Sequence, residues 1–433
     1  MTINHSNIST TADGADIFTV TDANSPFTNY GTLTTSGNLA SAIRGAASGI
    51  TITNRGALST SGDGSPGITV GDLFGAHYDN VTVTNYGTIA TTGNLFADDT
   101  TVAFPDGISA YGNNEKLVNY GSITVASPDG AGLDSVGSNC LLANYGGITA
   151  AGAGLASNAI DGSETGNILV NFGQIHTTAD GNFGIVCFSS NSVVKNYGTV
   201  QADGGLSFGI GMEANNRGEN YGTILATDDL GRGVLLSNDD SFDNYGTIRT
   251  TGANSVGARF SGDNLPGSDG GTFTNFGKII SSGLSVRGSA SDDHFVNRGS
   301  LSGNANLGGG DDIFVAGKGG SLSGTLTLGD GNDLIVFEKD GGSLTVADFV
   351  AGAGTDDVID VSAFGFHSFA ELMTHASQSG SDLILNLGGK DQIILENVNL
   401  GALNADDFSF ASPLLPHATA IVAHVPHGDY LLA

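Results

Sequence analysis

Two segments in the last third of the chain carry residue types that bind hard metal cations. Gly308–Val315 and Gly329–Val336 both fit the pattern G-x-G-x-D-x-hydrophobic-x. Calcium takes about six to eight oxygen ligands; glycines let backbone carbonyls turn toward an ion, and aspartate supplies negative charge. The hydrophobic residue two positions after the aspartate anchors the following strand in a core. The two segments therefore predict calcium sites between successive turns of the chain.

A degenerate third copy precedes these two segments. It covers Ser289–Val296, starts 19 residues before Gly308, and has serine at both glycine positions. The alternative interpretation is a set of Asx-turns on ordinary β-coils with a solvated acidic face, but the matching copies and their hydrophobic anchors favour calcium. The predicted metal-site residues of the three copies are Asp293, Gly308, Gly310, Asp311, Asp312, Gly329, Asp330, Gly331, Asn332 and Asp333.

The acidic block resembles a known family. Leu307–Val336 is similar to the repeats of the RTX (haemolysin-type calcium-binding) family, although the copies are few and not in tandem. Val346–Ser362 resembles the cap that follows RTX rolls in proteins exported by type I secretion, and so do Ser368–Leu372, Gly380–Leu385 and Asp406–Phe408. The resemblance covers roughly residues 288–433. It implies Asp357 and Asp360 as further calcium ligands.

The resemblance also implies a route of export. Residues 412–433 end in an acid followed by an apolar run, Asp429–Ala433, similar to an uncleaved type I secretion signal; a frayed tail is the alternative. Residues 1–14 contain no cationic segment followed by an apolar stretch, so no cleavable signal is expected there. We therefore expect a Gram-negative bacterial protein that a type I ABC transporter exports unfolded, and that is extracellular and associated with the cell surface. Calcium binding outside the cell would then supply folding free energy.

An internal repeat must position the acidic block. The string asparagine, aromatic or arginine, glycine, any residue, aliphatic recurs with a mean period of about 27 residues. Its eleven copies begin at Asn29, Asn54, Asn85, Asn119, Asn144, Asn171, Asn196, Asn220, Asn244, Asn275 and Asn297. Each unit reads as three short strands with period-2 alternation and glycine-rich corners. The repeat predicts stacked coils in which buried asparagines bond to one another, and it predicts positive φ at Gly31 and its equivalents.

The expected fold is therefore all-β. A parallel β-helix solenoid of about eleven coils should span residues 1–287 and continue into a calcium-binding β-roll at 288–345. A β-rich cap should follow at 346–411, and the export signal at 412–433. Cys140 and Cys187 lie in apolar runs and are expected to be buried free thiols.

Composition limits the partners of this protein. The 44 acidic residues against 14 basic ones give a net charge of -30, which argues against nucleic acid as a ligand. A hydrophobic share of 39% is too high for a disordered polyanion. No apolar run approaches the ~18 residues that a membrane-spanning helix needs.

Two functions fit these features. The preferred one is a structural, surface-layer or adhesin-like protein with calcium as cofactor, which self-associates through open β-helix ends or contacts a surface polysaccharide. The alternative is a calcium-dependent polysaccharide lyase or epimerase, which would need cations in a groove. The β-helix offers only eleven basic residues, scattered from Arg44 to Arg298. We therefore expect no catalytic site.

Individual residues give the enzyme little support. The best catalytic-looking cluster is His77–Asp79, but adjacent residues on a strand cannot all face one site. His176 looks like a lone exposed strand residue. Insertions at 71–80, 96–104 and 262–271 are the loops most suited to a binding site.

Overall fold

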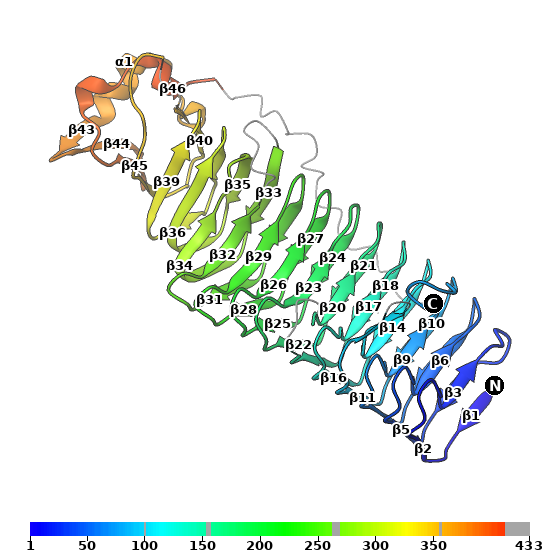
Figure 1. Ribbon diagram of the computed structural model, residues 1–433. Helices are drawn as coiled ribbons and strands as arrows, with labels where there is room; N and C mark the ends of the chain where they lie inside the picture. The colour runs from blue at the N-terminus through cyan, green and yellow to red at the C-terminus, as the bar shows by residue number, and fades with distance from the viewer. Residues whose placement is uncertain (99–100, 153–156, 262–268, 355–356, 412–433) are drawn as a thin grey trace.

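The chain folds into a long parallel β-solenoid of about 14 turns, with 49% of residues in strands and 4% in helices. This computed structural model describes residues 1–98, 101–152, 157–261, 269–354 and 357–411. Figure 1 shows the strands stacked one coil above the next from the N-terminus to the acidic block. The predicted all-β solenoid is confirmed.

Each coil contributes strands to three faces. The first face is one continuous sheet of 16 strands, almost all in parallel register. Its strands are β1 (Thr2–Asn4), β4 (Phe27–Asn29), β7 (Thr51–Asn54), β10 (Thr82–Asn85), β15 (Lys116–Asn119), β18 (Leu141–Asn144), β21 (Ile168–Asn171), β24 (Val193–Asn196), β27 (Arg217–Asn220), β30 (Ser241–Asn244), β33 (Asp269–Asn275), β35 (Asp292–Asn297), β37 (Ile313–Ala316), β40 (Leu334–Phe337), β42 (Val358–Asp360) and β46 (Phe408–Ser409).

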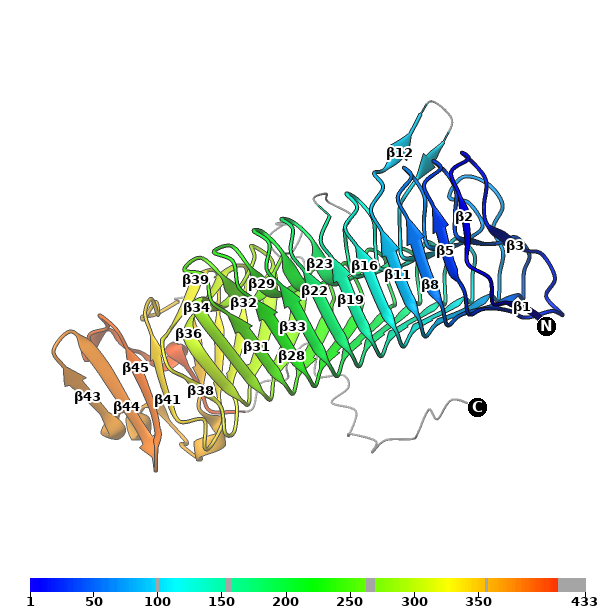
Figure 2. The ribbon, with the colours of Figure 1, turned by 90° about the horizontal axis from the view of Figure 1, so that it is seen from below.

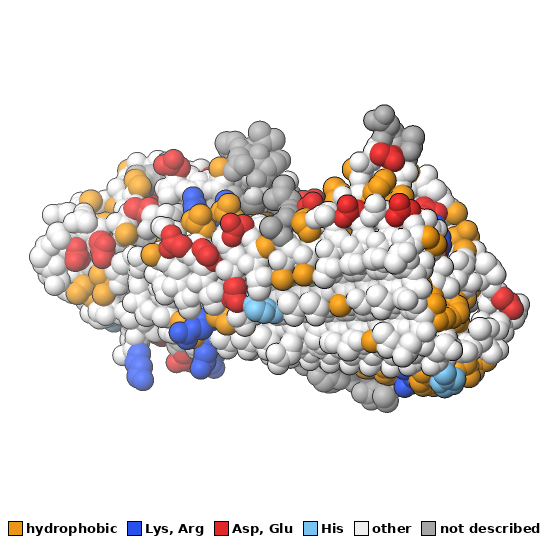
Figure 3. All heavy atoms as spheres, turned by 60° about the horizontal axis from the view of Figure 1, so that its bottom comes forward, with side chains coloured by type: hydrophobic (Ala, Val, Ile, Leu, Met, Phe, Trp, Pro, Cys, Tyr) orange, Lys and Arg blue, Asp and Glu red, His pale blue; other side chains and the backbone are white. Residues whose placement is uncertain are grey.

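The second face follows the asparagine corner. Its strands are β2 (Ile8–Thr10), β5 (Thr32–Thr35), β8 (Ala57–Thr60), β11 (Thr88–Thr91), β16 (Ser122–Val125), β19 (Gly147–Ala150), β22 (Gln174–Thr177), β25 (Thr199–Ala202), β28 (Thr223–Ala226), β31 (Thr247–Thr250), β34 (Lys278–Arg287), β36 (Ser300–Gly309) and β38 (Ser321–Leu322). Their outward residues are mostly small and polar, and Figure 3 shows broad uncharged rows with acidic side chains gathered along one margin.

The third face closes the coil. Its strands are β3 (Phe18–Val20), β6 (Ile43–Gly45), β9 (Ile68–Val70), β14 (Ile108–Ala110), β17 (Leu133–Ser135), β20 (Ile160–Gly162), β23 (Phe183–Cys187), β26 (Phe208–Met212), β29 (Arg232–Leu236), β32 (Val256–Phe260), β39 (Thr325–Asp330) and β41 (Ser343–Val346). The ten-residue strands β34 and β36 pass without interruption from the second face into the third. Because these strands have no turn between the second and third faces, each coil from Lys278 onward contains fewer residues.

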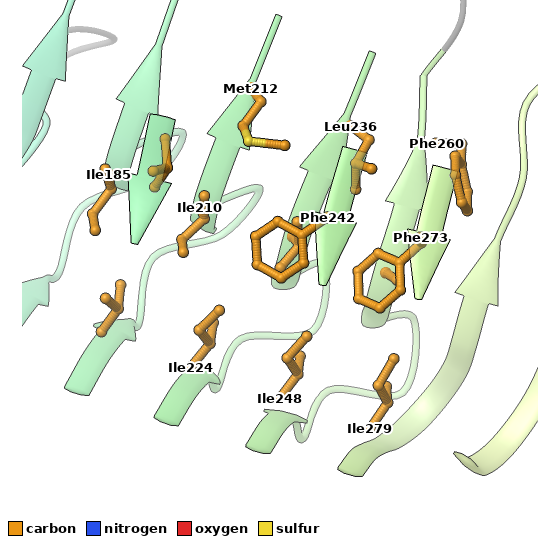
Figure 4. Close-up of a cluster of buried hydrophobic side chains, with 14 of the residues drawn as sticks. Ile185, Ile210, Met212, Ile224, Leu236, Phe242, Ile248, Phe260, Phe273 and Ile279 are labelled. Atoms are coloured by element: carbon orange, nitrogen blue, oxygen red, sulfur yellow. The ribbon is translucent and has the colours of Figure 1, made fainter. Parts of the chain in front are cut away.

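The core repeats from coil to coil. Alternate residues of each strand point inward, so that identical or similar side chains stack along the axis. Figure 4 shows two such rows, one formed by Ile224, Ile248 and Ile279 and the other by Phe242 and Phe273, all of them buried. Cys140 and Cys187 are buried free thiols, as predicted.

The asparagine ladder is confirmed, and it is one coil longer than the repeat indicates. Each asparagine Nδ2 donates to the Oδ1 of the next, over 2.7 Å from Asn4 to Asn29 and 2.8 Å from Asn196 to Asn220. The first coil does not match the repeat string, because His5 and Ser6 replace the aromatic residue and the glycine. His5 nevertheless stacks on Tyr30 with ring centroids 5.0 Å apart.

The prediction of positive φ at Gly31 is wrong. Gly31 is absent from the residues with positive φ. A Cβ there would instead lie 2.0 Å from the carbonyl oxygen of Ser6, and the same clash recurs at Gly56 with Gly31. Glycine is required because neighbouring coils approach closely at this corner.

The C-terminal end of the described solenoid is covered by a small cap. An antiparallel hairpin of β44 (Asp382–Gly388) and β45 (Asp391–Leu395), with β43 (Ala376–Ser379), joins β41 and closes the stack. The short helix α1 (Phe369–Leu372) and the 3-10 turns η1 (Ser362–Phe364), η2 (Met373–His375), η3 (Leu400–Ala402) and η4 (Ala405–Asp407) complete this cap. No described strand pairs with β1, β2 or β3 on the N-terminal side.

Two of the three predicted insertions leave the rod. Residues 71–80 form a loop, and β12 (Phe96–Ala97) and β13 (Val102–Ala103) form a small antiparallel hairpin that projects in Figure 2. The third insertion lies largely outside the described residues, and so does the expected export signal at 412–433. Among the helices that the structure describes, none is long and apolar enough to cross a membrane.

Candidate metal centre

Four predicted aspartates form one buried column, which we call the aspartate column. Asp293, Asp312, Asp333 and Asp357 each immediately precede or open a first-face strand, and all are at most 2% exposed. The N–H of Asp293 donates to Asp312 Oδ1 over 2.7 Å, and the N–H of Asp312 donates to Asp333 Oδ1 over 2.8 Å. The N–H of Asp333 donates to Asp357 Oδ1 over 3.2 Å. Residues from four separate coils are therefore held at one corner.

Three carboxylate oxygens of this column have no hydrogen-bond partner. They are Asp293 Oδ1, Asp312 Oδ2 and Asp333 Oδ2, and all three are inaccessible to solvent. Buried polar atoms normally find partners, because leaving one unpaired costs about 1–3 kcal/mol, and more for a charged group. The column can therefore be satisfied only by protons or by a cation.

The electrostatics of the column agree with its burial. Desolvation, together with the nearby carboxylates of Asp293 and Asp333, raises the pKa of Asp312 to about 10. Burial likewise raises the pKa of Asp333 to about 7 and that of Asp293 to about 6. The hydrogen bonds from backbone N–H groups oppose these shifts without cancelling them. Only a compensating positive charge would let all three carboxylates ionise at neutral pH.

A second, outer column runs beside the first. The N–H of Asp311 donates to Asp292 Oδ1, and the N–H of Asn332 donates to Asp311 Oδ1, both over 2.8 Å. Asp311, Asn332 and the predicted ligand Asp330 are exposed. Asp292 and Asp311 thus accept from the backbone of the neighbouring coil, and Asn332 Nδ2 donates to Asp311 Oδ1 over 2.9 Å.

The glycines of the two intact copies adopt the conformation that the motif requires. Gly308, Gly310, Gly329 and Gly331 have φ values of 108°, 108°, 112° and 146°, which L-residues with a side chain rarely adopt. In the degenerate copy, Ser289 fills one glycine position and donates from its N–H and Oγ to Asp293 Oδ2, over 2.7 and 3.1 Å. The degenerate copy thus supplies hydrogen bonds that the intact copies do not.

The two aspartates implied by the family resemblance lie at different places. Asp357 ends the aspartate column, and its Oδ2 accepts from the N–H of Val350 over 2.9 Å. Asp360 lies at the other end of β42, where its Oδ1 accepts from the N–H of Ser362 over 2.7 Å. The structure brings Asp357 to the column and leaves Asp360 outside it.

One carboxylate at the same block was not predicted. Asp348 accepts from the N–H groups of Leu328 and Gly329, over 2.8 and 3.0 Å, and so holds the second glycine turn from the following coil. Its only signal in the sequence is its place in the segment Val346–Phe349, directly after β41. The pairing depends on coil length, which this segment does not reveal.

The aspartate column continues a polar column of the β-helix. First-face register aligns Asp312 and Asp333 with positions occupied earlier by Cys140, Asn167, Ser192, Asn216 and Asp240. The same hydrogen bond recurs there: the N–H of Cys140 donates to Asn167 Oδ1, and the N–H of Ser192 donates to Asn216 Oδ1, over 2.8 and 2.9 Å. A neutral acceptor therefore satisfies this corner. Aspartate in successive acidic coils adds oxygens that the fold does not need.

Carboxylate oxygens are ligands that calcium prefers, but few of them converge at any one point of the column. Within the described part of the chain, no three or more histidine, cysteine, aspartate or glutamate side chains converge as a metal-binding group. A calcium ion at the column would therefore take one or two carboxylates at a time and complete its shell with backbone carbonyls and water, as this ion readily does. The unpartnered oxygens of Asp312 and Asp333 are the donors that such an ion would use.

The catalytic-looking residues of the sequence do not assemble. His77 lies in the 71–80 loop with Nε2 3.4 Å from the Leu73 carbonyl oxygen, while Asp79 accepts from the N–H of Asn113 over 2.8 Å. His176 is not alone, because its Nε2 lies 2.7 Å from Asp203 Oδ2 on the exposed second face. The sequence does not indicate this partner, because Asp203 belongs to the next coil.

A cleft of about 330 Å³ lies between the 71–80 loop and the β12–β13 hairpin. Its lining includes Arg44, Asp72, Phe74 and Tyr111, and Arg44 forms an ion pair with Asp72. Phe74 is 76% exposed. The cleft mixes aromatic and charged groups, but His77 and Asp79 are not part of its lining.

Comparison with known proteins gives limited information. No protein-family model matches the chain. A 65-residue stretch is 32% identical to the endo-1,3-1,4-beta-glycanase EglC of Rhizobium meliloti (strain 1021). This stretch is 15% of the present chain and 14% of that protein, so the chain spans only a small part of the relative it matches.

Proposed function

We propose that the protein is a calcium-binding structural component of a bacterial cell surface or extracellular matrix, and that calcium completes its folding. The observation that carries the proposal is the set of three buried, unpartnered carboxylate oxygens on Asp293, Asp312 and Asp333. In the β-helix this corner holds mostly neutral acceptors such as Asn167 and Asn216. It also holds one aspartate, Asp240, but both of its oxygens accept from backbone N–H groups, those of Asn216 and Ser237.

Calcium would supply the positive charge that this column lacks. Bound at the column, it would let Asp312 and Asp333 remain ionised inside the fold, and its binding energy would add to the stability of the acidic coils. The positive-φ turns at Gly310 and Gly331 leave their backbone carbonyls free to adapt to an ion. Among the described residues of the β-helix, one carboxylate oxygen is in the same position, Asp106 Oδ2, whereas the acidic coils bring three together in one column.

Export and surface location extend this proposal. The similarity of residues 288–433 to RTX proteins supports RTX-type identity, release through a type I ABC transporter, and folding outside the cell. The regular rod supports a structural role, and strands β1 to β3, which pair on one side only within the described residues, offer edges at which copies could associate.

A metal titration tests the proposal. Protein stripped with EDTA is titrated with calcium, and in parallel with magnesium, while far-UV circular dichroism and light scattering are recorded. We expect calcium to increase the β signal at concentrations where magnesium does not, because magnesium is smaller and keeps its water. Complete folding in EDTA with no response to calcium would overturn the calcium role. A calcium response without any rise in scattering would overturn self-assembly alone.

A carbohydrate-active enzyme remains a second candidate. The cleft beside Arg44 and Phe74 and the partial similarity to a glycanase are the observations that favour it. Incubation of the calcium-loaded protein with β-1,3-1,4-glucan, alginate and pectate tests it by the release of reducing ends or unsaturated products. Release that disappears on Asp72→Ala and persists on Asp13→Ala, which removes an exposed carboxylate on an earlier coil, would replace the structural role by catalysis.

A further inference from the structure

Three arginines that are far apart in the sequence form a strip on the third face. Arg259 of β32 pairs in register with Arg287 of β34, and it pairs on the other side with Leu235 of β29. Arg232 opens β29, three residues before Leu235. Basic residues that look scattered along the sequence thus occupy three consecutive coils.

No ion pair with a described residue reaches any of these three arginines. The ion pairs of the described chain belong to other basic residues, namely Arg44, His176, Lys195, Arg217, Arg298 and Lys318. The guanidinium of Arg232 lies 4.9 Å from the centre of the Phe208 ring. Three guanidiniums that form no ion pair within the described residues are unexpected in a chain with 44 acidic residues and only 14 basic ones.

The positive charges of the three arginines also repel one another. Burial, together with the nearby charges of Arg259 and Arg287, lowers the pKa of Arg232 to about 10. Burial and the charge of Arg287 likewise lower the pKa of Arg259. A bound anion would relieve this repulsion. Arg259 and Arg232 remain partly accessible and Arg287 is exposed, so an anion can reach them.

We infer that the Arg232–Arg259–Arg287 strip binds carboxylate or sulfate groups of an acidic polysaccharide. Guanidinium forks match these groups with two parallel hydrogen bonds. Coil stacking places Arg259 and Arg287 side by side on adjacent strands, ~4.8 Å apart, while Arg232 lies in register with Val256, three residues along the strand. Phe208 and Phe183, whose rings stack 4.7 Å apart, extend the strip with aromatic surface that suits the apolar part of a sugar.

The small size of the strip argues against nucleic acid as its ligand. It covers only three coils, whereas binding a phosphodiester backbone requires a broad cationic face. The rest of the molecule carries a net negative charge and would repel a long polyanion. A sparsely charged sugar chain, which presents two or three anionic groups to the strip, fits this pattern better.

This inference does not rest on the proposed calcium site. The arginines lie on coils that precede the aspartate column, and their partner is an anion. If calcium does not bind, the inference about the arginine strip still stands. If the polysaccharide does not bind, the proposal of calcium at the aspartate column still stands.

Binding of trigalacturonate to the full chain at one fixed calcium concentration tests the inference by titration calorimetry. We expect Arg259→Ala combined with Arg287→Ala to weaken binding at least tenfold, and the two lysine substitutions at these positions to give an intermediate loss. Arg249→Ala is the control, because it removes the same charge from an exposed position on the second face. It should change the affinity less than twofold. The methyl ester of the trisaccharide should bind at least tenfold more weakly than the acid.

Protein stability separates binding from folding in this experiment. Because the double alanine variant loses mutual repulsion, we expect its melting temperature to equal or exceed that of the parent protein. Equal binding by the double variant and the parent would overturn the inference. So would an equal loss in Arg249→Ala, equal binding of the ester, or no binding by the parent. Tighter, arginine-dependent binding of a trinucleotide would assign the strip to nucleic acid instead.

Discussion

The two ends of the first-face strands solve the same problem with different chemistry. At one end, the buried asparagines from Asn4 to Asn297 each donate through Nδ2 and accept through Oδ1, so the ladder satisfies itself. At the other end, Asp312 and Asp333 can only accept, and one oxygen of each stays unpartnered. An amide column is therefore complete within the protein, whereas a carboxylate column requires a proton or a cation from outside.

The largest expected effect comes from placing a carboxylate in the amide ladder. Asn196→Asp replaces the donor to Asn220 Oδ1, a bond of 2.8 Å, by a carboxylate oxygen that faces this acceptor, and it buries a negative charge. We expect the free energy of unfolding at pH 7 to fall by about 3–5 kcal/mol, as measured by urea denaturation. Asn191→Asp, at an exposed turn, is the control and should change little. Equal losses in the two variants would mean that the ladder does not depend on its amides.

The reverse substitution should remove the need for calcium. Asp312→Asn combined with Asp333→Asn keeps the acceptors for the neighbouring N–H groups and removes the unpartnered charges. In EDTA the double variant should be at least as stable as the parent. The parent should gain about 3 kcal/mol at a calcium concentration about 100 times its Kd, and the variant should gain almost nothing.

The exposed substitution Asp340→Asn is the control for this experiment, since it removes a carboxylate outside the column. Thermal melts with and without calcium measure all three proteins. An undiminished calcium response in the double variant would show that the ion binds elsewhere.

The pH dependence of stability should also distinguish the two columns. Burial raises the pKa of Asp293 to about 6 and of Asp333 to about 7, above the ~3.9 of an unfolded aspartate. The folded state then holds more protons than the unfolded state, so stability is greatest at low pH and falls as the pH rises through 6 and 7. In EDTA we expect these two groups together to cost about 4 kcal/mol between pH 5 and pH 7.5.

Other buried carboxylates contribute to the same trend, because burial raises the pKa of Asp106 to about 7 and that of Asp240 to about 7. The difference between the parent and the Asp312→Asn, Asp333→Asn variant isolates the contribution of the column. With calcium bound, this difference should shrink or reverse as the pH rises. Parallel pH profiles for the parent and the variant would contradict the role of the column.

The smallest effect concerns the rings beside the asparagine ladder. Tyr197 stacks between Phe172 and Tyr221 with centroid distances of 4.8 and 5.0 Å, and it is 39% exposed. Tyr197→Ala should cost about 1 kcal/mol, which is far less than a charge in the adjacent ladder. Tyr30→Ala, which loses only the contact with His5, should cost about half as much. Denaturation of both variants in urea checks this order.

The repeat allowed much of the fold to be predicted, because equal residues in successive coils must stack. The asparagine ladder, the three faces and the buried cysteines follow from that rule. The first coil was not predicted, because Ser6 replaces the glycine of the repeat. The prediction of positive φ at Gly31 was wrong, because the sequence does not reveal how closely neighbouring coils approach.

Residues on the third face are harder to place from sequence. Insertions change the spacing between an asparagine and the strand that follows it, so the pairing of Arg259 with Arg287 does not follow from the repeat period. For the metal centre, the motif identified the aspartates of the column. It did not identify which oxygen of each is already used, because that depends on backbone N–H groups of the neighbouring coil.

The stacked rings give each region a different optical signature. The chain contains no tryptophan and 10 tyrosines, none of which lies between residues 288 and 411. Eight rings from Tyr86 to Phe276 lie nearly parallel, with neighbouring centroids 4.7 to 5.0 Å apart. Near-ultraviolet ellipticity and tyrosine fluorescence therefore report on the asparagine-laddered coils and are nearly blind to the acidic ones. A calcium-dependent change in amide absorption with a constant tyrosine spectrum would locate the ordering event without any label.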